Sequence, residues 1–287
     1  MYSKILIIGA NGQLAFDLIR ALENEYTILK ATHSDFDICD YVATERFIKK
    51  NKPHVVINTA AFHNTTACEL DPSKSFQVNA VGAYNVAKAA ALVNASVVFL
   101  SSDYIFDGSK KKFSEEDKPN PLNVYGASKL AGEVLLKIAN PKYYIVRTTG
   151  MFGFKSSGKG HNFVTLMLEK AKLGEHIRVV NDQYVSPTYS FDLAGKIKEL
   201  VDKKAPYGIY HITNLGFCSW YEFAKKIFEL AQVNARISPI KSQASGSIVK
   251  RPQYSVLASK NLRRAGIKIL RPWQEALGAY LDELGQI

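Results

Sequence analysis

The sequence predicts an α/β protein with a doubly wound parallel sheet in its first half and a smaller cap formed mainly by its second half. Short apolar runs alternate with segments of helical periodicity, the first run ends in a glycine-rich turn, and this pattern changes after Gly150. Strands separated by helices form right-handed βαβ units, which build parallel sheets. We therefore expect residues 1–150 to form the sheet domain and residues 151–287 mainly the cap, with some strands within 177–213 rejoining the sheet.

The strands of the first half are short and continuously apolar, as expected for strands that are buried on both faces. We expect them at residues 4–9, 26–32, 54–60, 96–101 and 143–148. The intervening helical periodicity predicts helices at 12–23, 41–50, 71–93 and 124–138. The longest of these begins with Asp71 as its cap and Pro72 at its first position. Beyond residue 150 we expect helices at 162–173, 191–201, 220–231 and 273–284, and strands at 177–180 and 208–212.

Composition excludes several classes of protein. A hydrophobic content of 47% with 22% charged residues is ordinary for a globular core. No apolar run approaches the roughly 20 residues that cross a bilayer, and the N-terminus lacks a signal-peptide pattern, so we expect a cytoplasmic protein that binds no membrane. The three cysteines and six histidines are scattered, which argues against a disulfide scaffold and a metal site. The formal charge is +11, but the lysine clusters at 110–112, 203–204 and 225–226 lack interleaved aromatic residues, so we expect no nucleic-acid partner.

The turn after the first strand has the sequence Gly9-Ala10-Asn11-Gly12-Gln13-Leu14-Ala15. Glycines at a strand-to-helix turn let the backbone approach a pyrophosphate, whose charge the helix N-terminus stabilises. The spacing is GxxGxxA, in which Ala15 still permits close packing of helix on strand. Because the motif begins a βαβ unit, it predicts a dinucleotide cofactor rather than a plain turn.

The end of the second strand does not distinguish NADH from NADPH. An acidic residue there holds the ribose of NAD, and a nearby Arg accommodates the 2′-phosphate of NADP. Residues 31–34, Ala-Thr-His-Ser, offer neither. Asp37, further on, could accept a hydrogen bond from the adenine amino group or cap the next helix. Both cofactors therefore stay open.

Tyr125 and Lys129 are four residues apart and share one face of the helix predicted at 124–138. A lysine ammonium beside a phenol lowers the tyrosine pKa, and such a pair can give a proton to a developing alkoxide. Ser101 and Ser102 end the fourth strand, where open α/β sheets bind ligands, and Ser102 could polarise a carbonyl group. Each feature alone also has a structural explanation, namely a half-buried tyrosine beside a solvated lysine, and serines that begin a turn. Together they predict a hydride-transfer site.

These motifs, in this order, resemble the extended short-chain dehydrogenase/reductase superfamily, whose members have a Rossmann-type sheet and a C-terminal substrate-binding cap. The likeness is closer still to the dTDP-4-dehydrorhamnose reductases. Its most specific part is the segment 101–108, which contains the pair Asp103-Tyr104. The resemblance covers nearly the whole chain and is carried by residues 9–14, 37–38, 58–62, 101–108, 125–133, 147–148, 182–189 and 251–252.

The resemblance implies reduction of the 4-keto group of a nucleotide sugar, dTDP-4-dehydrorhamnose, by NADPH or NADH. It implies that Tyr125 donates the proton, that Lys129 tunes Tyr125 and holds the nicotinamide ribose, and that Ser102 polarises the keto group. The implied cofactor-binding residues are Gly9, Asn11, Gly12, Gln13, Leu14, Asp37, Ile38, Thr59, Ala60, Ala61, Phe62, Ser101, Tyr125 and Lys129. The implied substrate-binding residues are Ser102, Asp103, Tyr104, Tyr125 and Asn162.

Two positions in the sugar-binding region depart from the family pattern. Gly150 stands where a tryptophan often lies against the sugar, and Val185 stands where glycine is common. Two other functions stay open. An epimerase or dehydratase of the same superfamily is one, although the Asp103-Tyr104 pair argues against it. A non-catalytic NADP-binding regulatory subunit is the other, although Tyr125, Lys129 and Ser102 are all intact. A homodimer also stays open.

Overall fold

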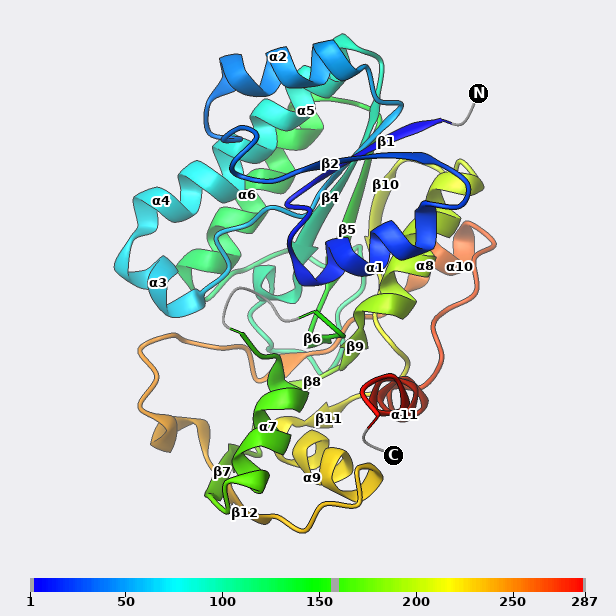
Figure 1. Cartoon of the computed structure of the whole chain (residues 1–287). Helices are drawn as coiled ribbons and strands as arrows, with labels where there is room; N and C mark the ends of the chain where they lie inside the picture. The colour runs from blue at the N-terminus through cyan, green and yellow to red at the C-terminus, as the bar shows by residue number, and fades with distance from the viewer. Residues whose placement is uncertain (1–2, 156–159, 286–287) are drawn as a thin grey trace.

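The computed structural model describes residues 3–155 and 160–285. Its centre is a six-stranded sheet with the strand order β10-β5-β4-β3-β1-β2, and every neighbouring pair is parallel (Figure 1). The strands are β1 (Lys4–Ile8), β2 (Thr27–Ala31), β3 (Val55–Asn58), β4 (Ser96–Ser102), β5 (Tyr143–Thr148) and β10 (Gly208–His211). This arrangement confirms the predicted parallel α/β fold. The reversal of strand order beside β1 is the place where doubly wound sheets bind ligands.

Helices cover both faces of the sheet, which explains why the strands are apolar throughout. Successive side chains of a strand point to opposite faces, so Ile5 and Ile7 pack on one side and Leu6 and Ile8 on the other. The first side is covered by α1 (Gln13–Leu22) and α8 (Ser190–Asp202). The second is covered by α2 (Tyr41–Asn51), α5 (Ala83–Leu92) and α6 (Val124–Ala139). Figure 1 shows the two helical layers on either side of the strands.

The helix predicted over residues 71–93 is not one continuous α-helix. It consists of α4 (Pro72–Phe76), the π-helix η1 (Gln77–Gly82) and α5, and it is preceded by an unpredicted short helix, α3 (Thr65–Leu70). The start is as predicted, because the side chain of Asp71 accepts a hydrogen bond from the backbone N–H of Lys74. The π-helical turns lie where α6 packs closely against the segment. A Cβ on Gly132 of α6 would lie 2.3 Å from the carbonyl oxygen of Asn79.

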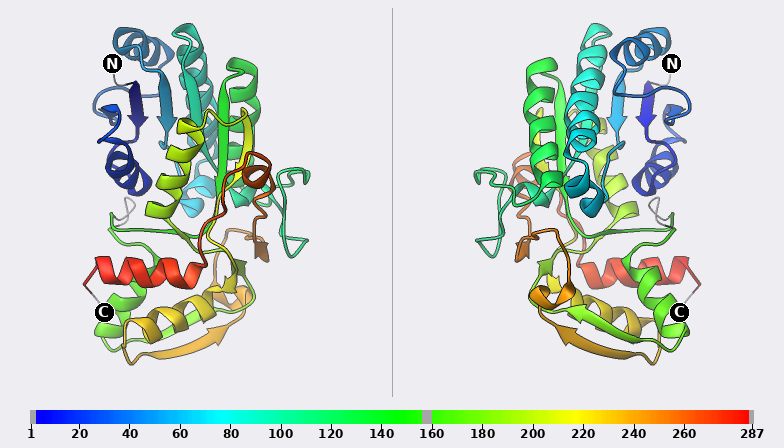
Figure 2. Two further views of the ribbon diagram at one scale, coloured as in Figure 1. Left: turned by 90° about the vertical axis from the view of Figure 1, so that its right-hand side faces the viewer. Right: turned by 90° about the vertical axis from the view of Figure 1, so that its left-hand side faces the viewer.

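A cap lies beside the carboxyl ends of the sheet strands, and the second half of the chain supplies most of it. Its helices are α7 (Phe163–Lys172), α9 (Trp220–Leu230) and α11 (Trp273–Glu283), which enclose an aromatic core that includes Phe152 and Phe223. Its strands are short and were mostly not predicted: β6 (Met151–Phe152), β7 (His176–Val180), β8 (Tyr184–Val185), β9 (Thr188–Tyr189), β11 (Cys218–Ser219), β12 (Arg236–Ile240) and β13 (Tyr254–Ser255). Figure 2 shows the cap helices lying across the end of the sheet from two sides.

Only one of the two strands expected within residues 177–213 joins the main sheet. β10 lies at the sheet edge beside β5, whereas β7 pairs with β12 inside the cap. The chain therefore crosses between the two parts more than once. In addition, α10 (Lys260–Arg264) returns to pack against β10.

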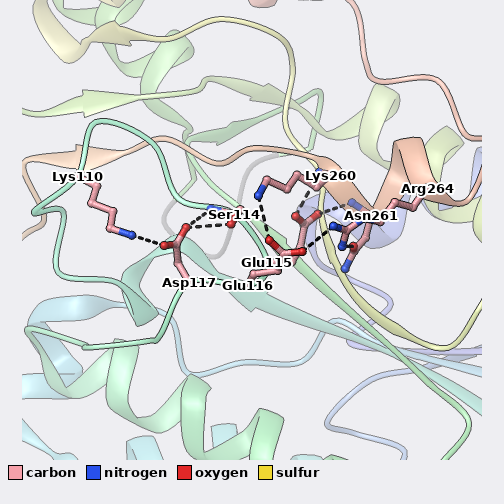
Figure 3. Close-up of polar contacts among 8 residues, drawn as sticks. All are labelled: Lys110, Ser114, Glu115, Glu116, Asp117, Lys260, Asn261 and Arg264. Carbon is pink, nitrogen blue, oxygen red and sulfur yellow. Dashed lines mark hydrogen bonds and ion pairs between the residues drawn. The ribbon is translucent and has the colours of Figure 1, made fainter.

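The long connection between β4 and α6 is tied to the C-terminal part of the chain by two glutamates (Figure 3). The carboxylate of Glu115 accepts hydrogen bonds from the backbone N–H groups of His211 in β10 and of Lys260 and Asn261 in α10, at 3.1 to 3.2 Å. Glu116 forms an ion pair with Lys260 at 2.9 Å. Since three backbone donors converge on one buried carboxylate, this connection is held in place on the way from β4 to α6.

Among residues 3–155 and 160–285, no helix has the length and apolar character that a bilayer span requires.

Candidate active site

A cavity of about 390 Å³ lies between the carboxyl ends of the sheet strands and the cap. Residues that follow β1, β3, β4 and β5 line one side, and residues of β8, α9 and the segment before β13 line the other. The cavity brings together most of the residues predicted from the sequence. Those in its lining are Gly12, Gln13, Leu14, Thr59, Ala61, Ser101, Ser102, Asp103, Tyr104, Tyr125 and Lys129.

The glycine turn has the geometry that close approach to a phosphate requires. Gly9 has a φ of +79°, and a Cβ there would lie 2.8 Å from the hydroxyl of Thr59 and 2.9 Å from the nitrogen of Ala60. Gly12 is the N-cap of α1, and no side chain caps this helix. The first turn of α1 also contains no acidic residue. Its backbone N–H groups are therefore free to bind an anion, and the positive end of the helix dipole favours one.

Gln13 provides an independent indication of a ligand at this turn. Its side chain is buried, and within the described part of the chain its amide nitrogen has no hydrogen-bond partner. A buried donor without a partner is costly, so such a group usually serves a ligand or an ordered water. Gln13 lines the cavity beside Gly12 and Leu14. The residues present thus fit a bound dinucleotide.

The segment after β3 is held in place by Asn79. Its side-chain oxygen accepts a hydrogen bond from the backbone N–H of Phe62, and its amide donates to the carbonyl oxygen of Phe62, both at 2.9 Å. The same amide donates to the hydroxyl of Ser128 in α6 at 2.9 Å, and that hydroxyl donates to the carbonyl oxygen of Tyr125 at 2.8 Å. Asn79 therefore connects the wall at Thr59–Phe62 to the helix that carries Tyr125. The π-helical turns of η1 place it there.

Tyr125 and Lys129 lie on the first turns of α6, at the predicted spacing. Asn123 caps this helix by accepting a hydrogen bond from the backbone N–H of Gly126 at 2.8 Å. Gly126 permits the helix to approach the β4 end, because a Cβ there would lie 2.0 Å from the carbonyl oxygen of Tyr104. The rings of Tyr104 and Tyr125 consequently meet edge to face, with their centroids 5.9 Å apart. Lys129 is buried, with its ammonium 4.1 Å from the centre of the Phe99 ring.

The pKa of Tyr125 differs from the expectation drawn from the sequence. It is raised, first because burial disfavours the phenolate and second because the negative charge of Asp103 is close, while the Ser102 hydroxyl acts in the opposite direction. Burial also lowers the pKa of Lys129 to about 7, against the opposing effect of Glu133. Burial and the charge of Asp103 therefore outweigh any lowering of the Tyr125 pKa by Lys129. Tyr125 is held as the protonated phenol.

Ser102 and Asp103 form a rigid corner at the end of β4. The Ser102 hydroxyl donates to a carboxylate oxygen of Asp103 at 3.0 Å and accepts from the backbone N–H of Tyr104 at 3.2 Å. The other carboxylate oxygen of Asp103 is buried without a hydrogen-bond partner within the described residues. Burial raises the pKa of Asp103 to about 6. The corner therefore presents a hydroxyl and a carboxyl group to the cavity, both oriented before a ligand arrives.

A buried ion pair lies behind Lys129. Arg147 of β5 donates from Nε and Nη2 to the two carboxylate oxygens of Glu133, at 2.9 and 2.6 Å. Ser101 also donates to Glu133. The negative charge of Glu133 favours the ammonium form of Lys129 one turn earlier on α6. Arg147 and Glu133 thus join β5, β4 and α6 directly below the cavity.

Several predicted residues do not line the cavity: Gly9, Asn11, Asp37, Ile38, Ala60, Phe62 and Asn162. Gly9, Ala60 and Phe62 shape its wall through the contacts given above. Asp37 accepts a hydrogen bond from the backbone N–H of Cys39 at 2.9 Å within the turn before α2, whereas the cap of α2, the alternative role for Asp37, is Asp40. Ile38 is buried in the core under α5.

Asn162 is the N-cap of α7, and its side chain is fully engaged. Its oxygen accepts from the backbone N–H groups of Val164 and Thr165, and its amide donates to the carbonyl oxygen of Gly153 and to the hydroxyl of Tyr280, at 2.7 to 3.1 Å. It is buried and outside the cavity lining. These bonds give Asn162 a structural role, and its contact with a substrate stays a prediction.

The cap contributes cavity residues that were not assigned from the sequence, chiefly Gln183, Tyr184, Trp220 and Arg251. Gln183, Tyr184 and Arg251 have a sequence signal, since they belong to the segments 182–189 and 251–252 that carry the family resemblance. Trp220 lies outside these segments, and no local pattern reveals its position at the cavity. Within the described residues, no group of three or more His, Cys, Asp or Glu side chains is placed to hold a metal ion.

Comparison with known proteins agrees with this geometry. The family described as the RmlD substrate binding domain matches residues 3–286. The chain is 37% identical over 283 residues to the Bacillus subtilis spore coat polysaccharide biosynthesis protein SpsK, covering 98% of each chain. It is 37% identical over 281 residues to dTDP-4-dehydrorhamnose reductase of Mycolicibacterium smegmatis, covering 96% of this chain and 84% of the relative.

Among solved structures, dTDP-4-dehydrorhamnose reductase of Bacillus anthracis, determined in complex with NADP, superimposes with a TM-score of 0.95 at 38% identity. The match covers 99% of this chain and all of that one. The sheet, the glycine turn and the Tyr125–Lys129 helix are thus those of a nucleotide-cofactor reductase fold, and this chain belongs to the RmlD substrate binding domain family.

Proposed function

We propose that this protein reduces the 4-keto group of a dTDP-linked 6-deoxy sugar, converting dTDP-4-dehydrorhamnose to dTDP-rhamnose at the expense of NADPH or NADH. The observation that carries the proposal is that Ser102, Tyr125 and Lys129 line one cavity together with an uncapped glycine turn. The relatives with the names reported above support the choice of substrate. The nicotinamide cofactor, when bound, supplies the hydride.

Tyr125 is the proton donor in this proposal. Its raised pKa keeps the phenol protonated at neutral pH, so a proton is available when negative charge develops on the keto oxygen. The Ser102 hydroxyl donates its single proton to Asp103 in the structure, and this proton would turn to the same keto oxygen when the substrate binds. Lys129, buried at the base of the cavity, holds the cofactor ribose and adds positive charge when it is protonated.

Two other parts of the cavity bind the phosphate groups. The N-terminal turn of α1 and the amide of Gln13 would hold the cofactor pyrophosphate. Arg251 lies on the opposite, cap side of the cavity, where it donates to the hydroxyl of Ser247 at 2.8 Å. Among the described residues it has no carboxylate within ion-pair distance. A guanidinium there suits the diphosphate of the nucleotide sugar.

In this proposal the two parts of the chain bind different ligands. Residues 1–150 bind the cofactor, with β10 completing their sheet, and residues 151–287 form mainly the substrate-binding cap. The reaction would serve polysaccharide biosynthesis in the cytoplasm. A homodimer stays a prediction.

The test follows the absorbance of NADPH, and separately of NADH, with dTDP-4-dehydrorhamnose as substrate. We expect oxidation of one cofactor molecule for each dTDP-rhamnose formed. Conversion of the substrate to a stereoisomer without net cofactor consumption would indicate an epimerase instead. No cofactor oxidation with either nicotinamide, despite cofactor binding, would indicate a non-catalytic subunit and would refute the proposal.

A further inference from the structure

The wall of the cavity has no side chain at residue 150, because this residue is glycine. Gly150 has a φ of +56°, and a Cβ there would lie 2.6 Å from Cγ2 of Val185. Val185 is almost fully buried and pairs with Cys218 across β8 and β11. A side chain at position 150 is therefore disfavoured both by its backbone conformation and by overlap with Val185.

Trp220 lies further along the same wall. It is the first residue of α9, and its backbone N–H donates to the carbonyl oxygen of Gln183, so it sits beside the β8 strand that contains Val185. The helix start is fixed by a capping box in which Ser219 and Glu222 bond each other's backbone N–H groups. Trp220 lines the cavity and is half-buried.

Two other aromatic rings pack against the indole of Trp220. Its centroid lies 4.6 Å from that of Phe163 and 6.2 Å from that of Phe223. A ring already fixed by packing loses little conformational freedom when a ligand binds to its free face. The chain contains one other tryptophan, Trp273, which is buried in the cap core and does not line the cavity.

Resting on the proposed function, we propose that Trp220 is the aromatic wall against which the apolar face and methyl group of the substrate's 6-deoxy sugar pack. Trp220 lines the same cavity as Ser102 and Tyr125, so a sugar whose keto group reaches these residues can also contact the indole. An indole face offers a large apolar contact area but no hydrogen bond to a keto or hydroxyl group. Trp220 would therefore select for the deoxygenated edge of the sugar and leave the keto group to Ser102 and Tyr125.

The first test uses tryptophan fluorescence of the protein saturated with NADP⁺, which needs no turnover. Addition of dTDP-rhamnose should change the emission of the wild-type protein and of Trp273→Phe, and this change should be lost in Trp220→Phe. Addition of dTDP alone should give a clearly smaller change, because it lacks the sugar. An unchanged response in Trp220→Phe, or an equal response to dTDP alone, would overturn the proposal.

The second test separates the effect on KM from that on kcat. Trp220→Ala should raise the KM for dTDP-4-dehydrorhamnose by about tenfold, the size of effect that a lost apolar contact produces, and leave the KM for NADPH within about twofold. Trp220→Phe should recover most of the loss. Tyr221→Ala, a half-buried neighbour outside the cavity lining, is the matched control and should leave both values unchanged. Equal sugar KM values in Trp220→Ala and Tyr221→Ala would refute the role of Trp220, whereas absence of turnover in the wild-type protein would refute the proposed function instead.

Discussion

Glu133, one turn after Lys129 on α6, forms with Arg147 a bidentate ion pair that is almost completely buried, and its carboxylate also accepts a hydrogen bond from Ser101. The pair joins α6, which carries Tyr125, to β4 and β5 of the sheet. Because both charges are removed from water, each is stabilised chiefly by the other.

Removing one partner of this pair should therefore destabilise the fold strongly. We expect Glu133→Gln to lower the free energy of unfolding by about 3–5 kcal/mol, since Arg147 is left as an uncompensated buried charge. Urea unfolding measures the change. Glu229→Gln, which breaks the exposed pair with Lys226, serves as the control and should cost less than about 1 kcal/mol. Similar losses in the two variants would contradict the importance of the buried pair.

Tyr125→Phe should lower kcat by roughly 10²- to 10⁴-fold, because it removes the phenol that we propose protonates the keto oxygen. Affinity for NADPH should stay within about twofold, since the ring and its edge contact with Tyr104 remain. Steady-state kinetics and cofactor titration measure the two quantities. A variant that turns over at the wild-type rate would exclude Tyr125 as the proton donor.

Catalysis should require the hydroxyl at position 102 but should tolerate a larger side chain there. Ser102→Ala removes the hydroxyl whose proton would turn from Asp103 to the keto oxygen, and we expect a loss of about 10²–10³-fold in kcat. Ser102→Thr keeps the hydroxyl and should retain most of the activity. If the two substitutions were equally damaging, the hydroxyl would not be the operative group.

The lowered pKa of Lys129 predicts a pH-dependent stability of the protein without bound cofactor. Burial lowers this pKa to about 7 in the folded state, below the usual value of about 10.4. Between these two values the unfolded chain binds a proton that the folded chain does not, so stability should rise with pH at up to about 1.4 kcal/mol per unit. Below pH 7 both states are charged and this contribution is constant.

Comparison with Lys129→Met isolates that effect. The difference in unfolding free energy between wild type and Lys129→Met should grow in favour of the wild type as the pH rises from about 7 to 10, because the variant has no proton to lose. Denaturant unfolding at several pH values gives the difference. A difference that does not change with pH in this window would show that Lys129 keeps an ordinary pKa.

Gly150→Ala should destabilise the protein by about 1–3 kcal/mol through its positive φ, with an added cost from overlap with Val185. Only the overlap is relieved by a smaller residue at position 185. In a double-mutant cycle, Gly150→Ala with Val185→Ala should cost at least about 0.5 kcal/mol less than the sum of the single changes.

The matched control for this cycle is Gly278→Ala in the middle of α11, where no atom would meet the new Cβ. Alanine there should stabilise the helix by up to about 1 kcal/mol. Strict additivity of the changes at 150 and 185 would show that the two side chains do not compete for the same space.

The parallel sheet, the glycine turn at Gly9–Gln13 and the spacing of Tyr125 and Lys129 were predictable from the sequence alone. Each depends on local periodicity or on a residue type required at one backbone position, and the structure and family membership confirm this fold. The same information placed Ser102 at the end of its strand. Local patterns suffice here because the residues within each feature are close together along the chain.

Contacts between distant segments decided the rest. Asn79 in η1 packs closely against Gly132, and Asn162 bonds to Gly153 and Tyr280. Trp220 is placed beside strands of only two residues each. The upward shift of the Tyr125 pKa likewise comes chiefly from burial and from Asp103, which lie outside the local Tyr-x-x-x-Lys pattern. The sequence by itself determined which chemical groups this protein brings to a reduction site, whereas the tertiary structure decided their protonation and the shape of the sugar pocket, because desolvation and packing arise only when distant residues are brought together.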